Sequence, residues 1–374
     1  MSPVETENNP SLVFHPTRRS LVAATLAVAA TYAYFLIFAQ FGFLRALTAA
    51  LGEGHDLVRP VLAVMGAAGI GGSVLVARRS RRSDGIQGMA MGFLLAGAAA
   101  GLSMVARTPV PFFCAAALTG LGTGMLTVGL AARLVRETGE RRLGLCLGAG
   151  TGLAYATCSW PPIFLAEAKT QASAGLLALA LGWFALRNFK QGGTEPTAPG
   201  ADYQPRGMAA WTLILLALVG FDSAAFYLIQ HTPDLQAAWA GSPQLAVNAA
   251  VHLVAGLGVG LALDRGWLGA ATLAATGMLA AGATLLFARS STAGAALYAA
   301  GVSVYSAVLV FYPARAGRPA LAALVYAVAG WTGSALGIGL AEQCGRLAGW
   351  VPVAVLSAVA GLLALRGKSA PWKI

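Results

Sequence analysis

The sequence predicts an all-α integral membrane protein made of two bundles of six helices. Of its 374 residues, 57% are hydrophobic and only 10% are charged, and apolar runs recur along the whole chain. Each run is about 20 residues long, which is the length of a helix that crosses the hydrocarbon core of a bilayer. Soluble domains carry roughly 25% charged residues, so the composition excludes an ordinary soluble enzyme.

The first half of the chain contains six apolar runs after a polar N-terminal tail at 1–19. The first run is longer than a signal-peptide core and has no evident cleavage site, which indicates a retained helix. Basic residues or prolines interrupt the later runs, as in ARRSRR after the second. We expect a bundle over 20–189, with helices at about 20–43, 60–77, 86–106, 109–132, 143–165 and 168–189.

The second half repeats this organisation after a polar segment at 190–208, which is expected to link the two bundles. The segment includes KQGGTEPTAPGADYQPRG, which is too polar and too rich in glycine and proline to continue a helix. A second bundle is expected over 209–365, followed by a tail at 366–374. Its helices are predicted at about 209–230, 243–263, 267–288, 292–313, 319–341 and 347–365.

The basic residues predict the orientation in the membrane. With the N-terminus inside, 19 of the 25 lysines and arginines fall on the cytoplasmic side and six fall outside. Cytoplasmic loops carry such an excess of basic residues, so both termini and the linker are expected in the cytoplasm. The expected location of the chain is the inner membrane. The net charge of +11 is spread between apolar runs and not gathered on one face, so a nucleic-acid partner is not expected.

The arrangement of six helices, a polar cytoplasmic linker and six helices resembles the major facilitator superfamily of secondary transporters, over about 20–365. In the segment GLALDRG, Gly260, Asp264 and Arg265 match the G-x-x-x-D-R core of the superfamily's gating loop. The resemblance implies that these residues brace neighbouring helices on the cytoplasmic side. The corresponding segment of the first half, GGSVLVARRSRRSDG, lacks the aspartate.

Two ionisable residues fall near the middle of predicted helices, Asp222 in the seventh and His252 in the eighth. An aspartate at the centre of a membrane helix costs roughly 2.5–3.5 kcal/mol, which makes such a residue a functional candidate. Ser223, Tyr227 and Gln230 extend the polar side of the seventh helix. Buried polar residues also tie helices together, and this is the alternative role for Asp222.

In the superfamily, a central cavity is lined mainly by the first, fourth, seventh and tenth helices. The resemblance therefore implies that Asp222 and His252 face a substrate, together with hydroxyl-bearing residues at similar depth: Tyr32, Tyr34, Tyr305 and Ser306. A carboxyl group in an apolar environment takes up a proton more readily than in water, so Asp222 is expected to carry a proton. A neighbouring imidazole can share that proton.

These features predict a secondary active transporter that moves a small neutral, amphipathic or cationic solute by alternating access, with protons coupled through Asp222. No nucleotide-binding motif and no catalytic nucleophile is evident, so neither an enzyme nor a cofactor is expected. Arg133 and Arg315 lie at the inner ends of the fourth and tenth helices, which leaves no mid-depth cation for a phosphate or dicarboxylate.

Two alternatives remain. The short loops would also suit a non-transporting subunit or assembly factor of a larger membrane complex. A copper importer is the second, with soft or borderline ligands at Met65, Met89, Met91, Met104, Met125, Cys158, His231 and His252. A copper-importing branch of the superfamily uses MxxxM and HxxxM pairs on the seventh and eighth helices. Here the seventh helix has no methionine, and Gly256 follows His252 by four residues, so no resident metal site is expected.

Overall fold

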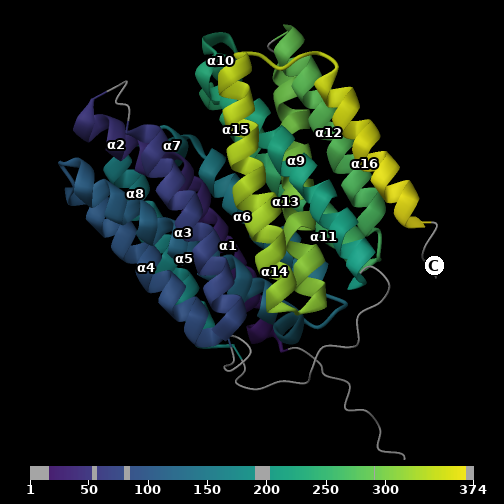
Figure 1. Ribbon diagram of the computed structural model, residues 1–374, viewed down its shortest axis with the longest axis horizontal. Helices are drawn as coiled ribbons and strands as arrows, with labels where there is room; N and C mark the ends of the chain where they lie inside the picture. The colour runs from purple at the N-terminus through teal and green to yellow at the C-terminus, as the bar shows by residue number, and fades with distance from the viewer. Residues whose placement is uncertain (1–16, 53–56, 80–84, 190–202, 290, 368–374) are drawn as a thin grey trace, which may run out of the picture.

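A computed structural model describes residues 17–52, 57–79, 85–189, 203–289 and 291–367. Helices dominate these ranges, and no strand occurs within them. Figure 1 shows the helices of the first half gathered on one side, in purple to teal, and those of the second half on the other, in green to yellow. Nine helices of the described ranges are long and apolar enough to cross a membrane, so the chain is a multi-pass membrane protein.

The helices of the first half begin with one continuous span in which α1 (Arg18–Tyr34) passes into the π-helical turn η1 (Phe35–Gly42) and then α2 (Phe43–Leu51). The others are α3 (Val58–Arg79), α4 (Ile86–Val105), α5 (Pro109–Thr138), α6 (Leu143–Ser159), α7 (Pro161–Phe164) and α8 (Ala168–Leu186). A π-helical turn widens the helix locally and often accompanies a functional site.

The second half begins with α9 (Pro205–His231), α10 (Pro233–Ala240), α11 (Ser242–Asp264), α12 (Leu268–Arg289) and α13 (Thr292–Ala316). A second composite span follows, in which α14 (Pro319–Val325) passes through the π-helical turn η3 (Tyr326–Thr332) into α15 (Gly333–Cys344). The last helix is α16 (Val351–Gly367). Several of these helices begin at proline, which has no N–H to leave unsatisfied in the first turn.

Each of the twelve predicted runs corresponds to a helix or composite span, but some ends differ. The first span continues to Leu51 instead of ending near 43, and α5 continues to Thr138 instead of ending near 132. Polar residues near the end of a membrane span can stay helical where they pack against other helices or reach water. The fifth run is divided at Trp160, since the prolines that follow start a new short helix. The short helix α10 lies in a segment where no helix was expected.

The predicted tails and linker fall mostly on residues outside the described ranges, namely 1–16, 190–202 and 368–374. The described ends are helical: α1 begins at Arg18, α9 at Pro205, and α16 ends at Gly367. We call the side where α8 ends and α9 begins the linker face, which is the lower side in Figure 1. The side with α2 and α10 is the opposite face.

The two halves contact each other through two seams and a central helix pair. α6 packs along α11, α3 packs against α14 and η3, and α5 packs against α13 and α14. Glycines allow the closest of these contacts: a Cβ added to Gly148 of α6 would lie 2.1 Å from the main-chain oxygen of Gly256 in α11. The backbones therefore touch directly along the α6–α11 seam.

Candidate functional site

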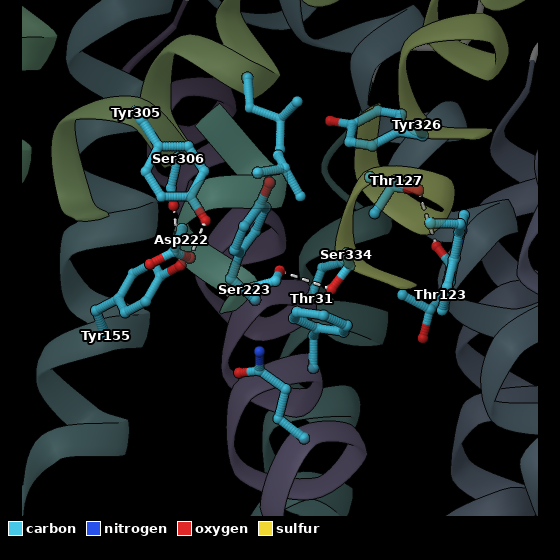
Figure 2. Close-up of a pocket in the computed structure, with 17 residues that line it drawn as sticks. Thr31, Thr123, Thr127, Tyr155, Asp222, Ser223, Tyr305, Ser306, Tyr326 and Ser334 are labelled. Atoms are coloured by element: carbon cyan, nitrogen blue, oxygen red, sulfur yellow. Dashed lines mark hydrogen bonds between the residues drawn. The ribbon is translucent and has the colours of Figure 1, made fainter. Parts of the chain in front are cut away.

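A cavity of about 150 Å³ lies between the two halves. Both composite spans contribute to it through their π-helical turns, which supply Phe35, Gln40, Tyr326, Gly330 and Trp331. The remaining lining residues come from α1, α5, α6, α9, α13 and α15: Thr31, Tyr32, Thr123, Thr127, Tyr155, Val219, Asp222, Ser223, Tyr305, Ser306, Leu309 and Ser334. Figure 2 shows that Asp222, Tyr155, Tyr305 and Ser306 gather on one side of the view, with the two α5 threonines on the other.

Asp222 is held by two tyrosines of α13. The hydroxyl of Tyr298 donates to Oδ1 at 2.5 Å and also lies 3.0 Å from the main-chain oxygen of Asp222. The hydroxyl of Tyr305 donates to Oδ2. The two tyrosines are seven residues apart, or about two helical turns, so they lie on the same face of α13. Both oxygens of the carboxylate therefore have a phenol donor.

A second compartment of about 50 Å³ adjoins the cavity toward the opposite face. Asp222, Gln40 and Tyr155 line both spaces, so Asp222 stands between them. The rest of its lining is largely apolar or aromatic: Leu36, Phe41, Cys158, Ser159, Phe164, Phe226, Trp239, His252 and Val302. Phe41 of η1 and Phe226 of α9 meet edge to face with ring centroids 5.9 Å apart, so aromatic rings join the two halves here.

His252 lies in this second compartment, away from the main cavity. Its Nδ1 is 2.7 Å from the hydroxyl oxygen of Ser303 in α13, and its ring stacks on Tyr155 with centroids 4.9 Å apart. Tyr155 in turn shares a hydrogen bond of 2.9 Å with Ser306. Tyr155 is therefore the residue through which His252 reaches the cavity that contains Asp222.

Five of the residues predicted from the sequence line the main cavity together: Tyr32, Asp222, Ser223, Tyr305 and Ser306. His252 lines the second compartment. The other three predicted residues, Tyr34, Tyr227 and Gln230, line neither space.

The three that fall outside do so for reasons of helical geometry. Tyr34 is two positions, or about 200°, from Tyr32 around the helix, so it points into the first bundle. There it is fully buried and donates to the main-chain oxygen of Ala96 at 3.0 Å. Tyr227 follows Ser223 by one turn, but it lies beyond the cavity, where it stacks on His231 with ring centroids 4.0 Å apart. Gln230 lies still closer to that end of α9.

Several residues that line the cavity or contact Asp222 escaped the sequence analysis. Tyr298 precedes Tyr305 by two turns, and this spacing was a usable signal. Tyr155, Tyr326 and Trp331 carried no such signal, because aromatic residues are common in membrane helices and pack equally well against lipid or protein. Only the packing of α6 and η3 against the other helices places these rings at the cavity.

The predicted bracing residues lie at the linker face of the α6–α11 seam. Asp264 accepts hydrogen bonds from the main-chain amides of Gly144 at 2.6 Å and Leu145 at 2.9 Å, in the first turn of α6. Gly260 packs against the backbone of Gly144, since a Cβ on Gly260 would lie 2.7 Å from the Gly144 oxygen. Arg265 donates to the oxygen of Leu261 in its own helix at 3.3 Å.

Arg133 proves to be deeply buried, because α5 continues past the end that was expected for this helix. It forms an ion pair of 2.8 Å with Glu137, whose main-chain oxygen accepts a hydrogen bond of 2.7 Å from Ser20 of α1. The pair joins α1 to α5 near the linker face, and neither residue lines the cavity. The sequence analysis did not consider Glu137 as a buried carboxylate.

Comparisons with known proteins give a consistent result for the fold. No protein-family model matches the sequence, and no curated protein matches it. Solved structures do match over nearly the whole chain. The human organic anion transporter MFSD10 is 14% identical with a TM-score of 0.62, and the match covers 94% of this chain and 99% of that one.

The chain has the major facilitator fold. The Major Facilitator Superfamily transporter FucP in its outward conformation gives a TM-score of 0.65 at 12% identity, covering 93% of this chain and 99% of FucP. A bacterial homologue of the iron transporter ferroportin, in an outward-facing state, gives 0.62 at 17% identity, covering 95% and 99%. The predicted resemblance is therefore confirmed for the fold, and identities this low carry no information about the solute.

Proposed function

We propose that this protein is a secondary active transporter that moves a small neutral, amphipathic or cationic solute across the inner membrane by alternating access, with both termini in the cytoplasm. The observation that carries the proposal is the position of Asp222, the only carboxylate among the residues that line the cavity and the second compartment. A group that stands between two spaces is suited to exchange protons with each in turn. One solved structure of similar fold is of the Escherichia coli fucose:proton symporter FucP, which transports with protons.

Protonation of Asp222 must rearrange its hydrogen bonds. The ionised carboxylate accepts from both Tyr298 and Tyr305. A neutral carboxyl group carries its own O–H donor, so the oxygen that takes the proton can no longer accept from its phenol in the same way. That phenol must then accept from Asp222 or turn toward the cavity. The protonation state of Asp222 on α9 is thereby coupled to the positions of Tyr298 and Tyr305 on α13.

His252 is proposed to modulate this exchange from the second compartment. It reaches the cavity through its stack on Tyr155, and Ser303 fixes the orientation of its ring. A side chain in that position affects how readily Asp222 exchanges protons without itself holding the solute. Replacing His252 by glutamine should shift the pH dependence of transport and preserve its coupling to the gradient.

The proposal is tested by a solute screen in proteoliposomes, with and without an imposed proton gradient. Asp222→Asn keeps the shape of the side chain but fixes it neutral, so it should abolish gradient-driven accumulation, while exchange of a solute that does not itself bind the carboxylate continues. Asp234→Asn is the matched control, because Asp234 is exposed in the first turn of α10. Full accumulation by Asp222→Asn would exclude Asp222 as the coupling site.

A further inference from the structure

We propose that the cavity selects organic monocations with a compact apolar body, such as quaternary ammonium compounds, and that the cation and a proton compete for Asp222. This inference rests on the proposed transport function and names the substrate class of the same site. Four properties of the cavity support it: the sign of its charge, the lone pairs of its hydroxyl oxygens, its aromatic rings and its size.

The charge of the cavity is negative or zero. Asp222 is the one acidic side chain among the described lining residues, and lysine, arginine and histidine are absent from that set. Arg45, near the opposite face, donates to the main-chain oxygens of Phe164 at 3.0 Å and Ala166 at 2.8 Å. An anionic solute would therefore meet a carboxylate and no cationic partner, which is unfavourable in a medium of low dielectric constant.

About half of the hydroxyl hydrogens of the cavity are already donated within the protein, while the Thr123 hydroxyl has no partner. Tyr305 donates to Asp222, while Ser223 pairs with Ser334 at 2.8 Å and Tyr155 with Ser306 at 2.9 Å. Thr31 and Thr127 donate to main-chain oxygens of their own helices, Ala27 at 2.9 Å and Thr123 at 3.0 Å. The hydroxyl oxygens keep lone pairs that can be directed at a positive charge.

Six aromatic residues line the cavity. They are Tyr32, Phe35, Tyr155, Tyr305, Tyr326 and Trp331, from both halves of the chain. The faces of such rings carry partial negative charge and attract ammonium groups, above all those surrounded by methyl groups. A cavity of about 150 Å³ has room for a compact ammonium compound, and not for a large amphipathic one.

The cation and the proton each carry one positive charge and bind the same carboxylate, so their exchange moves no net charge across the membrane. When the cation leaves Asp222 toward one side, a proton from that same side replaces it and is released on the other side after the site has reoriented, so one cation moves out for each proton that moves in. The titratable groups that face Asp222 are Tyr298 and Tyr305 of α13 and Tyr155 of α6. Cys158 of α6 and His252 of α11 face it across the second compartment. None of these carries a fixed positive charge that would replace the cation.

The test uses three compounds of the same shape and different charge: choline, its neutral carbon analogue 3,3-dimethylbutan-1-ol, and the anion 3,3-dimethylbutanoate. Binding to the full chain in lipid nanodiscs is measured by calorimetry at acidic and at alkaline pH. We expect choline to bind at least about tenfold more tightly than the neutral analogue, to weaken at acidic pH, and to release protons when it binds. Equal affinity for choline and its neutral analogue, or tighter binding of the anion, would overturn the inference.

Two variants sharpen the test. Asp222→Asn should remove the preference for choline over its neutral analogue together with the proton release. Trp331→Leu should weaken choline binding several-fold, whereas Trp267→Leu, at an exposed tryptophan just before α12, should not change it. An unchanged preference in Asp222→Asn would contradict the inference.

The outcomes separate this inference from the proposed function. If choline binds with the expected charge preference but no cation crosses the membrane in proteoliposomes, the substrate class stands and the transport function fails. If a neutral solute is accumulated in a manner that requires Asp222 while choline does not bind, the transport function stands and the inference fails.

Discussion

The seam between α6 and α11 joins the two halves through their backbones, whereas the seam between α3 and the α14–α15 span joins them through side chains. In the first seam, Gly144 and Gly148 face Gly256 and Gly260, and a Cβ on Gly256 would lie 2.5 Å from the oxygen of Gly148. Asp264 closes this seam at the linker face by accepting from two main-chain amides of α6.

Among the described residues, the second seam has neither glycines that bring the two backbones together nor a carboxylate that accepts from main-chain amides of the other half. The ring of Trp331 occupies the space over Gly69, where a Cβ would lie 2.1 Å from Cε2 of the indole. The helix α3, which corresponds to α11 in the second half, carries no acidic residue along its length. At the opposite face, Arg59 pairs with Glu342 at 2.6 Å, and the Arg59 side chain is 78% exposed.

This difference indicates which seam acts as the pivot. The α6–α11 seam is packed like a helix pair inside one bundle, such as α3 and α5, where a Cβ on Gly124 would lie 2.2 Å from the oxygen of Gly69. Backbones in contact cannot adjust by changing rotamer, whereas an indole ring and an exposed ion pair can. We therefore expect the halves to rotate about α6–α11 while the second seam opens and closes.

The largest effect is expected from Gly148→Ala. The new Cβ would lie 2.1 Å from a main-chain oxygen, so the two helices must separate, at a cost of about 1–3 kcal/mol. Gly258→Ala is the matched control, because a Cβ there meets nothing within 4 Å, and it should leave stability unchanged or slightly raised. Thermal unfolding of the purified proteins in detergent measures both. Equal shifts in Tm for the two variants would contradict the assignment of a backbone seam.

A smaller effect is expected from Asp264→Val, which removes the carboxylate that closes the first seam at the linker face. The loss of two hydrogen bonds to α6 should favour opening at the linker face by about 1–3 kcal/mol in the conformational equilibrium, without unfolding the protein. The measurement is labelling of Ser306→Cys by thiol reagents added to either side. The exposed Cys114 and Cys344, and Cys158 of the second compartment, are first replaced by serine.

The control for this experiment is Arg265→Gln, since Arg265 donates to a main-chain oxygen of its own helix. Labelling of Ser306→Cys should be the same in the control as in the parent. If Asp264→Val leaves the labelling unchanged from both sides, the bracing role inferred from the resemblance does not apply to this chain.

The smallest effect is expected at the exposed pair of the second seam. Ion pairs exposed to solvent contribute roughly 0.2–1 kcal/mol and are screened by salt. A double-mutant cycle of Arg59→Gln and Glu342→Gln, read by thermal unfolding at low and high salt, should give a coupling in that range that decreases with salt. A coupling larger than that of the Asp264 contact would reverse the proposed order of the two seams.

The helices and their order could be predicted because membrane spans follow from composition and length alone. Pro109 and Pro319 mark the starts of helices for a local reason, the fixed backbone angle of proline. The two π-helical turns could not be predicted in this way. They shift the hydrogen-bond register by one residue, and what decides whether such a shift is favourable is the packing of neighbouring helices.

The candidate site was predictable only in part. A carboxylate in an apolar run is conspicuous by itself, so Asp222 was identified from the sequence. Its partners Tyr298 and Tyr305 lie on a helix about 80 positions away in the chain, and only one of them was expected at the cavity. Tyr32 and Tyr34 show the same limit, because they lie on opposite sides of one helical turn and the sequence does not specify which side faces the other half.

The sequence by itself therefore determined that the chain crosses the membrane many times in two similar halves and that Asp222 falls within one of the apolar spans, because the cost of placing polar groups in hydrocarbon acts on each residue separately. Only the tertiary structure decided which seam is formed by backbone contact and which groups the hydroxyls of the cavity bond. It also decided that Asp222 lines both the cavity and the second compartment. Those properties depend on contacts between helices that are distant in the chain, and such contacts leave no local pattern in the sequence.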